Sequence, residues 1–267
     1  MGEILKMESR AKNRITHLFE KRKEKLLNVY FTAGFPALDD TVRIAKALEE
    51  AGADLLEIGI PYSDPIADGP TIQESSTQAI ENGMSIQVLF DQLAALRTQV
   101  QIPVLLMGYL NPVIQYGVKQ FCQKCQEVGV DGLILPDLPM HEYEEVYAET
   151  FEASGIQNVF LVTPQTATSR IRTIDANSDG FIYLVSSASV TGAKTGISEE
   201  QTAYFKRINA MELQSPTLIG FGISNKETFE TACQYSRGAI IGSAFIKQLA
   251  DDASDEAIHH FVKTIIS

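Results

Sequence analysis

The sequence predicts an α/β protein, a single (β/α)8 TIM barrel with an extra helix at its N-terminus. Short apolar runs that suit buried parallel strands recur eight times, and a helix-like stretch lies between most of them. The eight units fill about 240 residues, or roughly 30 residues each, which is the size of one strand–helix repeat. The full length of 267 residues is normal for one such barrel.

The predicted strands are nearly continuous in hydrophobicity, which is typical of parallel strands covered on both faces. In chain order they are residues 28–33, 54–59, 103–109, 132–137, 158–164, 180–186, 216–222 and 238–244. A doubly wound open sheet is the alternative, but it normally has about five to seven strands and often carries G-x-G-x-x-G after the first. Here the first strand is followed by GFPALDD, so the barrel is favoured.

Amphipathic stretches between the strands predict the helices, and several of them end in Gly, as helix C-termini often do. The clearest are residues 38–52, 85–100, 140–155 and 254–267. The first 25 residues are rich in Lys and Arg, and four apolar side chains lie among them at roughly helical spacing. These are Ile15, Leu18, Phe19 and Leu26. We predict a charged helix over 1–25 that docks on the barrel (26–267) by this narrow stripe, with a lipid-binding helix as the alternative.

Composition and charge narrow the class of protein. The chain is 45% hydrophobic with 22 Lys and Arg against 34 Asp and Glu, a net charge of −12. An acidic chain with a pI near 4.8 is not typical of nucleic-acid binders. Apolar runs stay short of the roughly 20 residues that span a bilayer. Charges stand in the first residues where a signal peptide has its apolar stretch, so we expect a cytoplasmic protein.

Two cysteines, Cys122 and Cys125, form a C-x-x-C pair. Such a pair alone could indicate zinc or redox chemistry, but a structural zinc site needs a second pair of ligands, and no other close Cys or Cys/His pair follows. The surrounding segment FCQKCQEVG reads as an amphipathic helix. We therefore expect both thiols to be ordinary helix residues and the chain to hold no metal.

In a barrel of this kind, chemistry belongs at the C-terminal ends of the strands and in the loops that follow them. The second strand ends with Glu57 amid apolar residues, where burial would raise its pKa toward the value that a general acid/base needs. The loop over 61–70 is stiffened by prolines and holds a second carboxylate, Asp68. A solvated or salt-bridged carboxylate is the alternative for Glu57, and Asp64 could serve the turn itself.

Glycine-rich turns follow the sixth, seventh and eighth predicted strands, in the sequences SSASVTGAKTG, GFGISN and GSA. Glycines let backbone N–H groups approach a ligand, and a helix starting at Ser243 adds its positive dipole end. Barrels frequently bind phosphate at this place. The sequence therefore predicts a phosphate site, although such turns also occur without ligands.

The run LEIGIPYSDPIADGPTIQ (56–73) resembles the most diagnostic segment of the tryptophan synthase alpha chain family. YFTAGFP (30–36), LMGYLNP (106–112) and LPDLP (135–139) are similar to further landmarks of that family. Gly220-Phe221-Gly222, the run Ser189 to Gly192 and the pair Gly242-Ser243 resemble its loops around the substrate phosphate. The resemblance covers essentially residues 26–267.

The resemblance implies a lyase that cleaves indole-3-glycerol phosphate to indole and glyceraldehyde 3-phosphate. It places Glu57 and Asp68 at the positions of the two catalytic carboxylates. It gives substrate-binding positions to Tyr30, Leu106, Tyr183, Thr191, Gly192, Phe221, Gly222, Gly242 and Ser243. Among these, Leu106 and Tyr30 would wall the indole pocket. Tyr30 replaces a phenylalanine seen in some members, which adds a hydroxyl that needs a partner.

The resemblance also implies an α2β2 complex with a tryptophan synthase beta chain. Pyridoxal phosphate is then expected only on the beta chain, and no cofactor on this one. The apolar, proline-rich runs 61–70, 106–112 and 135–141 would form the docking rim. Three alternatives stay open: a stand-alone lyase for indole-3-glycerol phosphate, a sugar-phosphate isomerase on the same kind of barrel, and a catalytically idle partner subunit.

Overall fold

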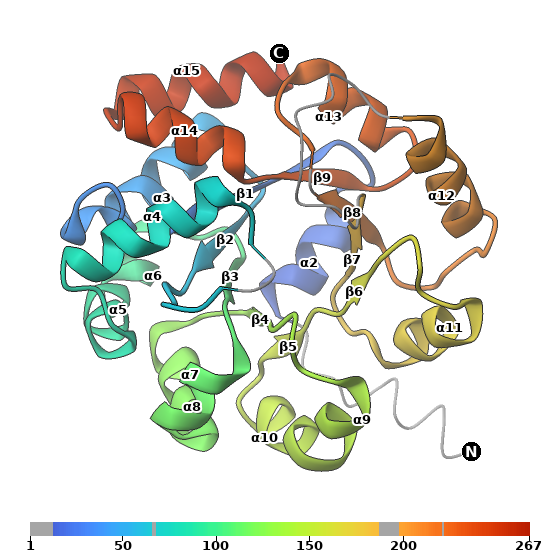
Figure 1. Ribbon diagram of the computed structural model, residues 1–267, viewed down its shortest axis with the longest axis horizontal. Coiled ribbons are helices and arrows are strands. Elements are labelled where there is room, and N and C mark those ends of the chain that lie inside the picture. Colours follow the sequence, from blue (N-terminus) through green and yellow to red (C-terminus); the bar gives the residue numbers. More distant parts are fainter. Residues whose placement is uncertain (1–12, 66–67, 187–197, 221) are drawn as a thin grey trace.

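The strands of the protein form a ring with helices around it, as the computed structural model shows for residues 13–65, 68–186, 198–220 and 222–267 (Figure 1). All strand pairs are parallel. The strands are β1 (Leu26–Thr32), β2 (Leu55–Gly59), β3 (Val104–Met107), β4 (Gly132–Ile134), β5 (Gln157–Asn158), β6 (Leu161–Val162), β7 (Ile182–Val185), β8 (Thr217–Gly220) and β9 (Gly238–Ile241). All eight predicted strand segments overlap one of these strands or, for 158–164, two; β1 begins two residues before its predicted segment.

The ring closes at β5 and β6, which stand at the two ends of the sheet order β5-β4-β3-β2-β1-β9-β8-β7-β6. These two short strands belong to one extended segment, and each half of that segment pairs with a different neighbouring strand. Its first half pairs with β4, where the Val159 N–H donates to the Leu133 carbonyl at 2.9 Å. Its second half pairs with β7, where the Tyr183 N–H donates to the Phe160 carbonyl at 3.0 Å. One shared segment therefore completes an eight-stranded barrel, as predicted.

Except for the N-terminal helix, the helices follow the strands and cover the outside of the barrel (Figure 1). They are α2 (Arg14–Lys21), α3 (Thr41–Ala51), α4 (Pro70–Glu81), α5 (Ile86–Leu93), α6 (Leu96–Gln99), α7 (Leu110–Tyr116), α8 (Val118–Val128), α9 (Met140–Glu142), α10 (Ala148–Ala153), α11 (Thr168–Asn177), α12 (Glu199–Asn209), α13 (Lys226–Cys233), α14 (Ser243–Asp251) and α15 (Asp255–Ile266), with a 3-10 turn at Leu38–Asp40 and a π-helical turn at Tyr143–Tyr147. Two predicted helices are interrupted: 85–100 is split into α5 and α6, and the π-helical turn separates α9 from α10.

Side chains alternate along each strand between two cores, because successive residues of a strand point to opposite sides. The outer set, which includes Val29, Leu56 and Leu106, packs against the helices. The inner set fills the barrel together with α2. Its buried members are Ile15, Phe19, Leu26, Leu55, Leu105, Ile134, Val159, Phe181, Tyr183, Val185, Leu218 and Ile240.

Helix α2 plugs the end of the barrel where the strands begin. Its Ile15 is fully buried and Phe19 nearly so. Two glycines make room for Ile15, because a Cβ atom on Gly132 or Gly180 would lie 3.1 or 3.2 Å from its side chain. The predicted apolar stripe is thus confirmed for α2. One assignment is wrong: Leu26 is the first residue of β1 and not part of the helix, because the chain turns between the two.

The cysteines lie on α8 as predicted, and both are buried. Burial raises the pKa of Cys122 to about 11 and that of Cys125 above its usual range, so neither is a thiolate near neutral pH. Among the described residues, no group of three or more His, Cys, Asp or Glu side chains could hold a metal ion. No helix in the described ranges is long and apolar enough to cross a membrane.

Candidate active site

Glu57 lies on the inner face of β2 and is fully buried. Asn28 on β1 donates from its amide Nδ2 to the carboxyl Oε1 at 2.5 Å. The other oxygen, Oε2, is buried and has no hydrogen-bond partner within the described part of the chain. Desolvation raises the Glu57 pKa from 4.5 to about 8, and the Asn28 hydrogen bond opposes that shift only in part. This carboxyl can therefore give or take a proton near neutral pH.

Asp68 lies on the loop between β2 and α4. The hydroxyl of Tyr109, at the end of β3, donates to its Oδ2 at 3.0 Å. Gln73 on α4 donates to the backbone carbonyls of Asp68 at 2.8 Å and of Pro65 at 3.2 Å, which ties the loop to the helix that follows. Burial raises the Asp68 pKa, and the Tyr109 hydrogen bond counteracts this. The second carboxylate is thus held by its loop and by one tyrosine.

Tyr30 satisfies its extra hydroxyl within a chain of hydrogen bonds. Ser75 donates to the Ile72 carbonyl at 2.9 Å, so its oxygen is left to accept from Thr32 at 2.7 Å. The Thr32 hydroxyl is also hydrogen-bonded to the Tyr30 hydroxyl, and this bond acts against the rise in the Tyr30 pKa. The same hydroxyl lies over the backbone of Gly59, where a Cβ atom would be only 2.1 Å away. Glycine at 59 is therefore needed for a tyrosine at 30.

Tyr183 repeats this arrangement on the other side of the barrel. Its hydroxyl lies over Gly220, where a Cβ atom would be 2.2 Å away. Burial raises the pKa of Tyr183 and Tyr30 well above the usual value, and the nearby Glu57 and Asp68 carboxyls raise both further. Both phenols are therefore neutral at physiological pH. Together they place aromatic walls beside the Glu57 carboxyl.

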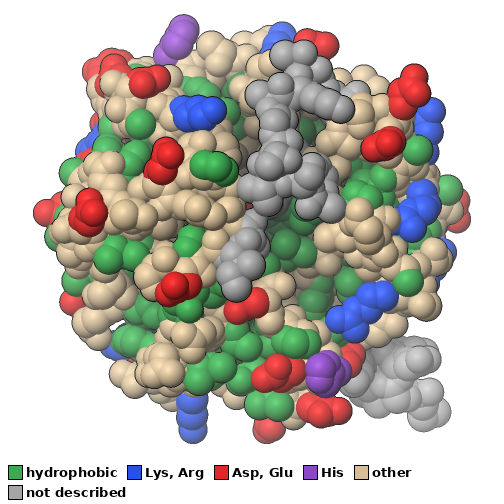
Figure 2. Space-filling model, viewed as in Figure 1, with side chains coloured by type: hydrophobic (Ala, Val, Ile, Leu, Met, Phe, Trp, Pro, Cys, Tyr) green, Lys and Arg blue, Asp and Glu red, His purple; other side chains and the backbone are tan. Residues whose placement is uncertain are grey.

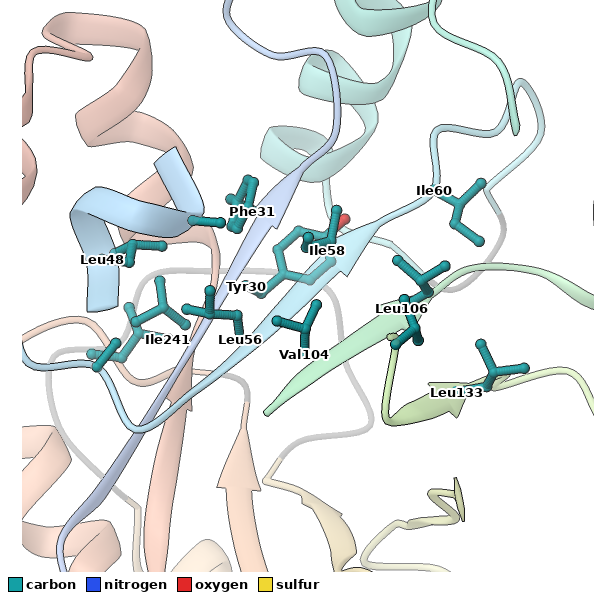
Figure 3. Packing of buried hydrophobic residues seen from close by; sticks show 14 of the residues in the cluster. Tyr30, Phe31, Leu48, Leu56, Ile58, Ile60, Val104, Leu106, Leu133 and Ile241 are labelled. Carbon is teal, nitrogen blue, oxygen red and sulfur yellow. The ribbon is translucent and has the colours of Figure 1, made fainter. Parts of the chain in front are cut away.

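A narrow pocket opens between these groups at the C-terminal ends of the first strands. It is lined by Tyr30, Ile60, Tyr62, Asp68, Ser76, Met107, Gly108, Tyr109 and Pro136. Leu106 is absent from this lining and belongs to the outer core, fully buried among the residues drawn in Figure 3. The prediction for Leu106 is therefore wrong by one residue. Met107 is the side chain of β3 that faces the pocket, because neighbouring strand residues point to opposite faces.

Of the predicted phosphate positions, Gly222 follows β8, and Gly242 and Ser243 follow β9, which pairs with β8 in the sheet. Gly222 has φ of +79°, a conformation that favours glycine. Gly242 precedes α14, whose first residue is Ser243, and no side chain of the described residues caps this helix. By contrast, Ser198, Asn225 and Ser254 cap α12, α13 and α15 with their side chains. The first N–H groups of α14 thus lack the side-chain acceptor that caps those three helices.

Three predicted substrate positions, Thr191, Gly192 and Phe221, lie outside the described residues. Two contributors went unnoticed in the sequence. Asn28 could have been found as a polar residue two positions before Tyr30 on the same face of a strand. The Tyr109 contact with Asp68 depends on how a loop folds back, and no sequence pattern signals it.

A closed barrel with a buried carboxyl of raised pKa on an inner strand face is typical of an enzyme of the (β/α)8 class. The family model for the tryptophan synthase alpha chain matches residues 17–265. The chain belongs to the tryptophan synthase alpha chain family, and it is accordingly a lyase of tryptophan biosynthesis.

Relatives and solved structures agree with this assignment. The chain is 60% identical over 253 residues to the tryptophan synthase alpha chain of Flavobacterium psychrophilum, covering 95% of this chain and 99% of that one. It is 57% identical to the alpha chain of Flavobacterium johnsoniae, with the same coverage. The crystal structure of tryptophan synthase subunit alpha from Legionella pneumophila is similar with a TM-score of 0.86 at 32% identity, covering 96% of this chain and 97% of that one.

Proposed function

We propose that this chain cleaves indole-3-glycerol phosphate to indole and glyceraldehyde 3-phosphate with Glu57 and Asp68 as its catalytic carboxyls. The observation that carries the assignment is the buried Glu57 carboxyl, whose pKa of about 8 lets it act as both acid and base near neutral pH. Its Oε2 has no partner among the described residues, so it can engage a substrate. The two alternatives for this carboxylate were exposure to solvent and a salt bridge. Neither fits Glu57, because it is fully buried and its partner among the described residues is a neutral amide.

The reaction is a retro-aldol cleavage that needs two proton movements. Glu57 in its acid form protonates C3 of the indole ring, and the resulting carboxylate then accepts the proton of the glycerol hydroxyl as the carbon–carbon bond breaks. Asp68 accepts a hydrogen bond from the ring N1–H and stabilises the positive charge that develops on the indolenine. Tyr30, Tyr183 and Met107 supply the apolar walls for the ring.

The phosphate group is proposed to bind at the start of α14. Backbone N–H groups there lack the side-chain caps present on α12, α13 and α15, and a helix N-terminus attracts an anion. Gly222 at the end of β8 would contribute its backbone, together with the predicted positions Thr191, Gly192 and Phe221. Anchoring the substrate by its phosphate orients the reacting carbon against Glu57.

Substitution of the two carboxyls tests the assignment. Glu57→Gln keeps the volume but cannot transfer a proton, so indole release should fall by at least about 10²–10⁴-fold, and Asp68→Asn should also lose most of the activity. Asp64→Asn is the matched control, because Asp64 lies on the same loop, is exposed and bonds only to Ser63 among the described contacts. Activity of Glu57→Gln within about tenfold of wild type would refute the acid/base role.

Gly242→Ala tests the phosphate site. The added Cβ would meet the Tyr30 ring at 3.4 Å, an ordinary van der Waals distance, so the fold should tolerate it. The methyl group would nevertheless stand at the start of α14, where the phosphate is proposed to bind. We expect KM for indole-3-glycerol phosphate to rise more than kcat falls. An unchanged KM would place the phosphate elsewhere.

We infer further that the chain works with a beta chain that docks on the rim around the pocket. Hydrophobic side chains gather on the molecular face drawn in Figure 2, and Ile114 on α7 is 45% exposed. Asp137, in the loop after β4, accepts from the Leu110 N–H at the start of α7 at 2.9 and 3.1 Å, which joins two of the predicted rim segments. This contact holds the two segments together, which supports their use as a docking surface.

The rim is also connected to the proposed catalytic site. The Tyr62 and Tyr109 rings lie 5.1 Å apart, and Tyr109 donates to Asp68. A partner that packs on Tyr62 would restrict Tyr109 and thereby fix the Asp68 carboxylate, which favours the active arrangement. Titration of a tryptophan synthase beta chain, with its pyridoxal phosphate, should raise the rate of indole formation. No complex by sedimentation, with an unchanged rate, would favour the stand-alone lyase.

A further inference from the structure

Asn28 and Glu57 form an isolated pair of polar side chains inside the barrel. Asn28 is fully buried on β1, and its amide donates to Glu57 Oε1 at 2.5 Å. The remaining oxygen of each group, Asn28 Oδ1 and Glu57 Oε2, is buried without a partner within the described ranges. A buried polar side chain with unsatisfied atoms destabilises a fold. Asn28 is therefore poorly explained as a residue that serves packing alone.

The hydrogen bond distinguishes the two carboxyl oxygens of Glu57. An amide N–H can donate to the carbonyl oxygen of a carboxylic acid or to an oxygen of a carboxylate, so Oε1 accepts from Asn28 in both protonation states. The acid proton then belongs on Oε2. A neutral amide also stabilises the carboxylate less than Arg or Lys would, so it does not force Glu57 into the ionised form.

We propose that Asn28 is a positioning residue for the lyase reaction, which holds Oε1 of Glu57 and thereby reserves Oε2 to carry and transfer the proton. The proton moves from Oε2 to C3 of the indole ring and returns to Oε2 from the glycerol hydroxyl, while Asn28 neither gains nor loses a proton. This inference rests on the proposed role of Glu57 as the acid/base.

Other titratable groups lie around the Glu57 carboxyl, and they must be left unchanged in the variants used for a test. They are Tyr30 on β1, Tyr183 on β7, Asp68 on the loop after β2, and Tyr109 at the end of β3, which bonds to Asp68. Burial raises the pKa of both Tyr30 and Tyr183, so these phenols stay neutral through the pH range in which Glu57 titrates. β3 contributes only Leu105 and Met107 to this interior.

The decisive readout is the pH profile of kcat/KM for indole-3-glycerol phosphate. Because Glu57 must be protonated to donate a proton to C3, activity falls as pH rises through its pKa. Asn28→Val removes the donor that stabilises the carboxylate, so this alkaline limb should move up by about one pH unit or more. Asn28→Asp keeps the shape but puts a second carboxyl against Glu57, and should move the limb at least as far. In both variants kcat should fall more than KM changes.

Asn158→Val is the matched control, because Asn158 is also a buried strand asparagine with an unpartnered Oδ1 among the described residues, but on β5. It should lower stability without moving the limb. Suppose that Glu57→Gln abolishes turnover, but the alkaline limb of the pH profile does not move in folded Asn28→Val and Asn28→Asp enzymes. The inference about Asn28 is then wrong. If Glu57→Gln itself remains active, the failure lies instead with the proposed function.

Discussion

The two ends of the barrel bury their acidic side chains in opposite ways. At the end where the strands begin, Asp131 binds Arg14 at 3.0 Å and Arg97 at 2.7 Å, and accepts from the Val104 N–H at 2.9 Å. Toward the other end, Glu57 is equally buried, but within the described part of the chain one of its oxygens accepts from a neutral donor and the other has no hydrogen-bond partner. Paired burial stabilises the charged form, whereas unpaired burial leaves a carboxyl that exchanges protons.

The paired end also contains an internal repeat. Asp54 and Asp131 each follow a helix-ending glycine by two residues and each accept from a backbone N–H that lies 27 positions earlier, in Leu27 and Val104. Asp54 adds an ion pair with Arg22, just beyond α2. Burial raises the Asp54 pKa, but the Leu27 N–H and Arg22 both oppose that rise. These aspartates fasten the strand starts and the N-terminal plug together.

Asp131→Asn should give the largest change in stability. Loss of its charge removes the ion-pair partner of Arg97, whose side chain is only 17% exposed. The free energy of unfolding should fall by roughly 3–5 kcal/mol, while kcat of the folded enzyme stays close to wild type. Glu127→Gln, which removes the exposed partner of Lys124, is the control and should change stability by less than about 1 kcal/mol. An equal loss of unfolding free energy in the two variants would contradict the difference proposed between buried and exposed ion pairs.

Glu57→Gln should change stability in the opposite direction. The folded chain holds the Glu57 proton up to pH about 8, whereas the unfolded chain releases it near its ordinary pKa. At a pH between these two pKa values, unfolding releases the Glu57 proton. The stability of the wild type therefore falls as pH rises from the unfolded to the folded pKa. At pH 9 the variant should be more stable than wild type by roughly 2–4 kcal/mol, and near pH 4.5 the gain should disappear. Denaturant unfolding at both pH values measures this; a constant difference would contradict it.

Tyr109→Phe should give the smallest effect, because it removes one hydrogen bond and leaves the ring. Without this donor the pKa of Asp68 should rise further, since the hydrogen bond now opposes the effect of burial. The ratio of kcat/KM between wild type and variant should correspond to a loss of about 0.5–1.5 kcal/mol in transition-state stabilisation. A loss as large as that of Asp68→Asn would mean that Tyr109 itself takes part in the chemistry.

Strand order and the two carboxyls could be predicted from the sequence, because near-continuous apolar runs and a carboxylate at a strand end are local signals. The sequence did not predict which side chains of a strand point into the barrel. Leu106 was assigned to the pocket that Met107 lines, because a shift of one residue moves a side chain to the opposite face of the strand. The Asn28 partner of Glu57 and the Tyr109 partner of Asp68 arise between different strands and loops. Tertiary packing sets both pairings: the sequence pattern can place Asn28 on the inner face of its strand, but it does not show which side chain it contacts, and it gives no signal for Tyr109.

The central claim is that Glu57 is buried without a compensating charge so that it can exchange a proton near neutral pH. Its carboxyl carbon can be followed directly by NMR in protein labelled at glutamate, with Glu57→Gln to assign the signal. The account predicts a titration midpoint of about 8. A midpoint close to the ordinary glutamate value of 4.5 would contradict it.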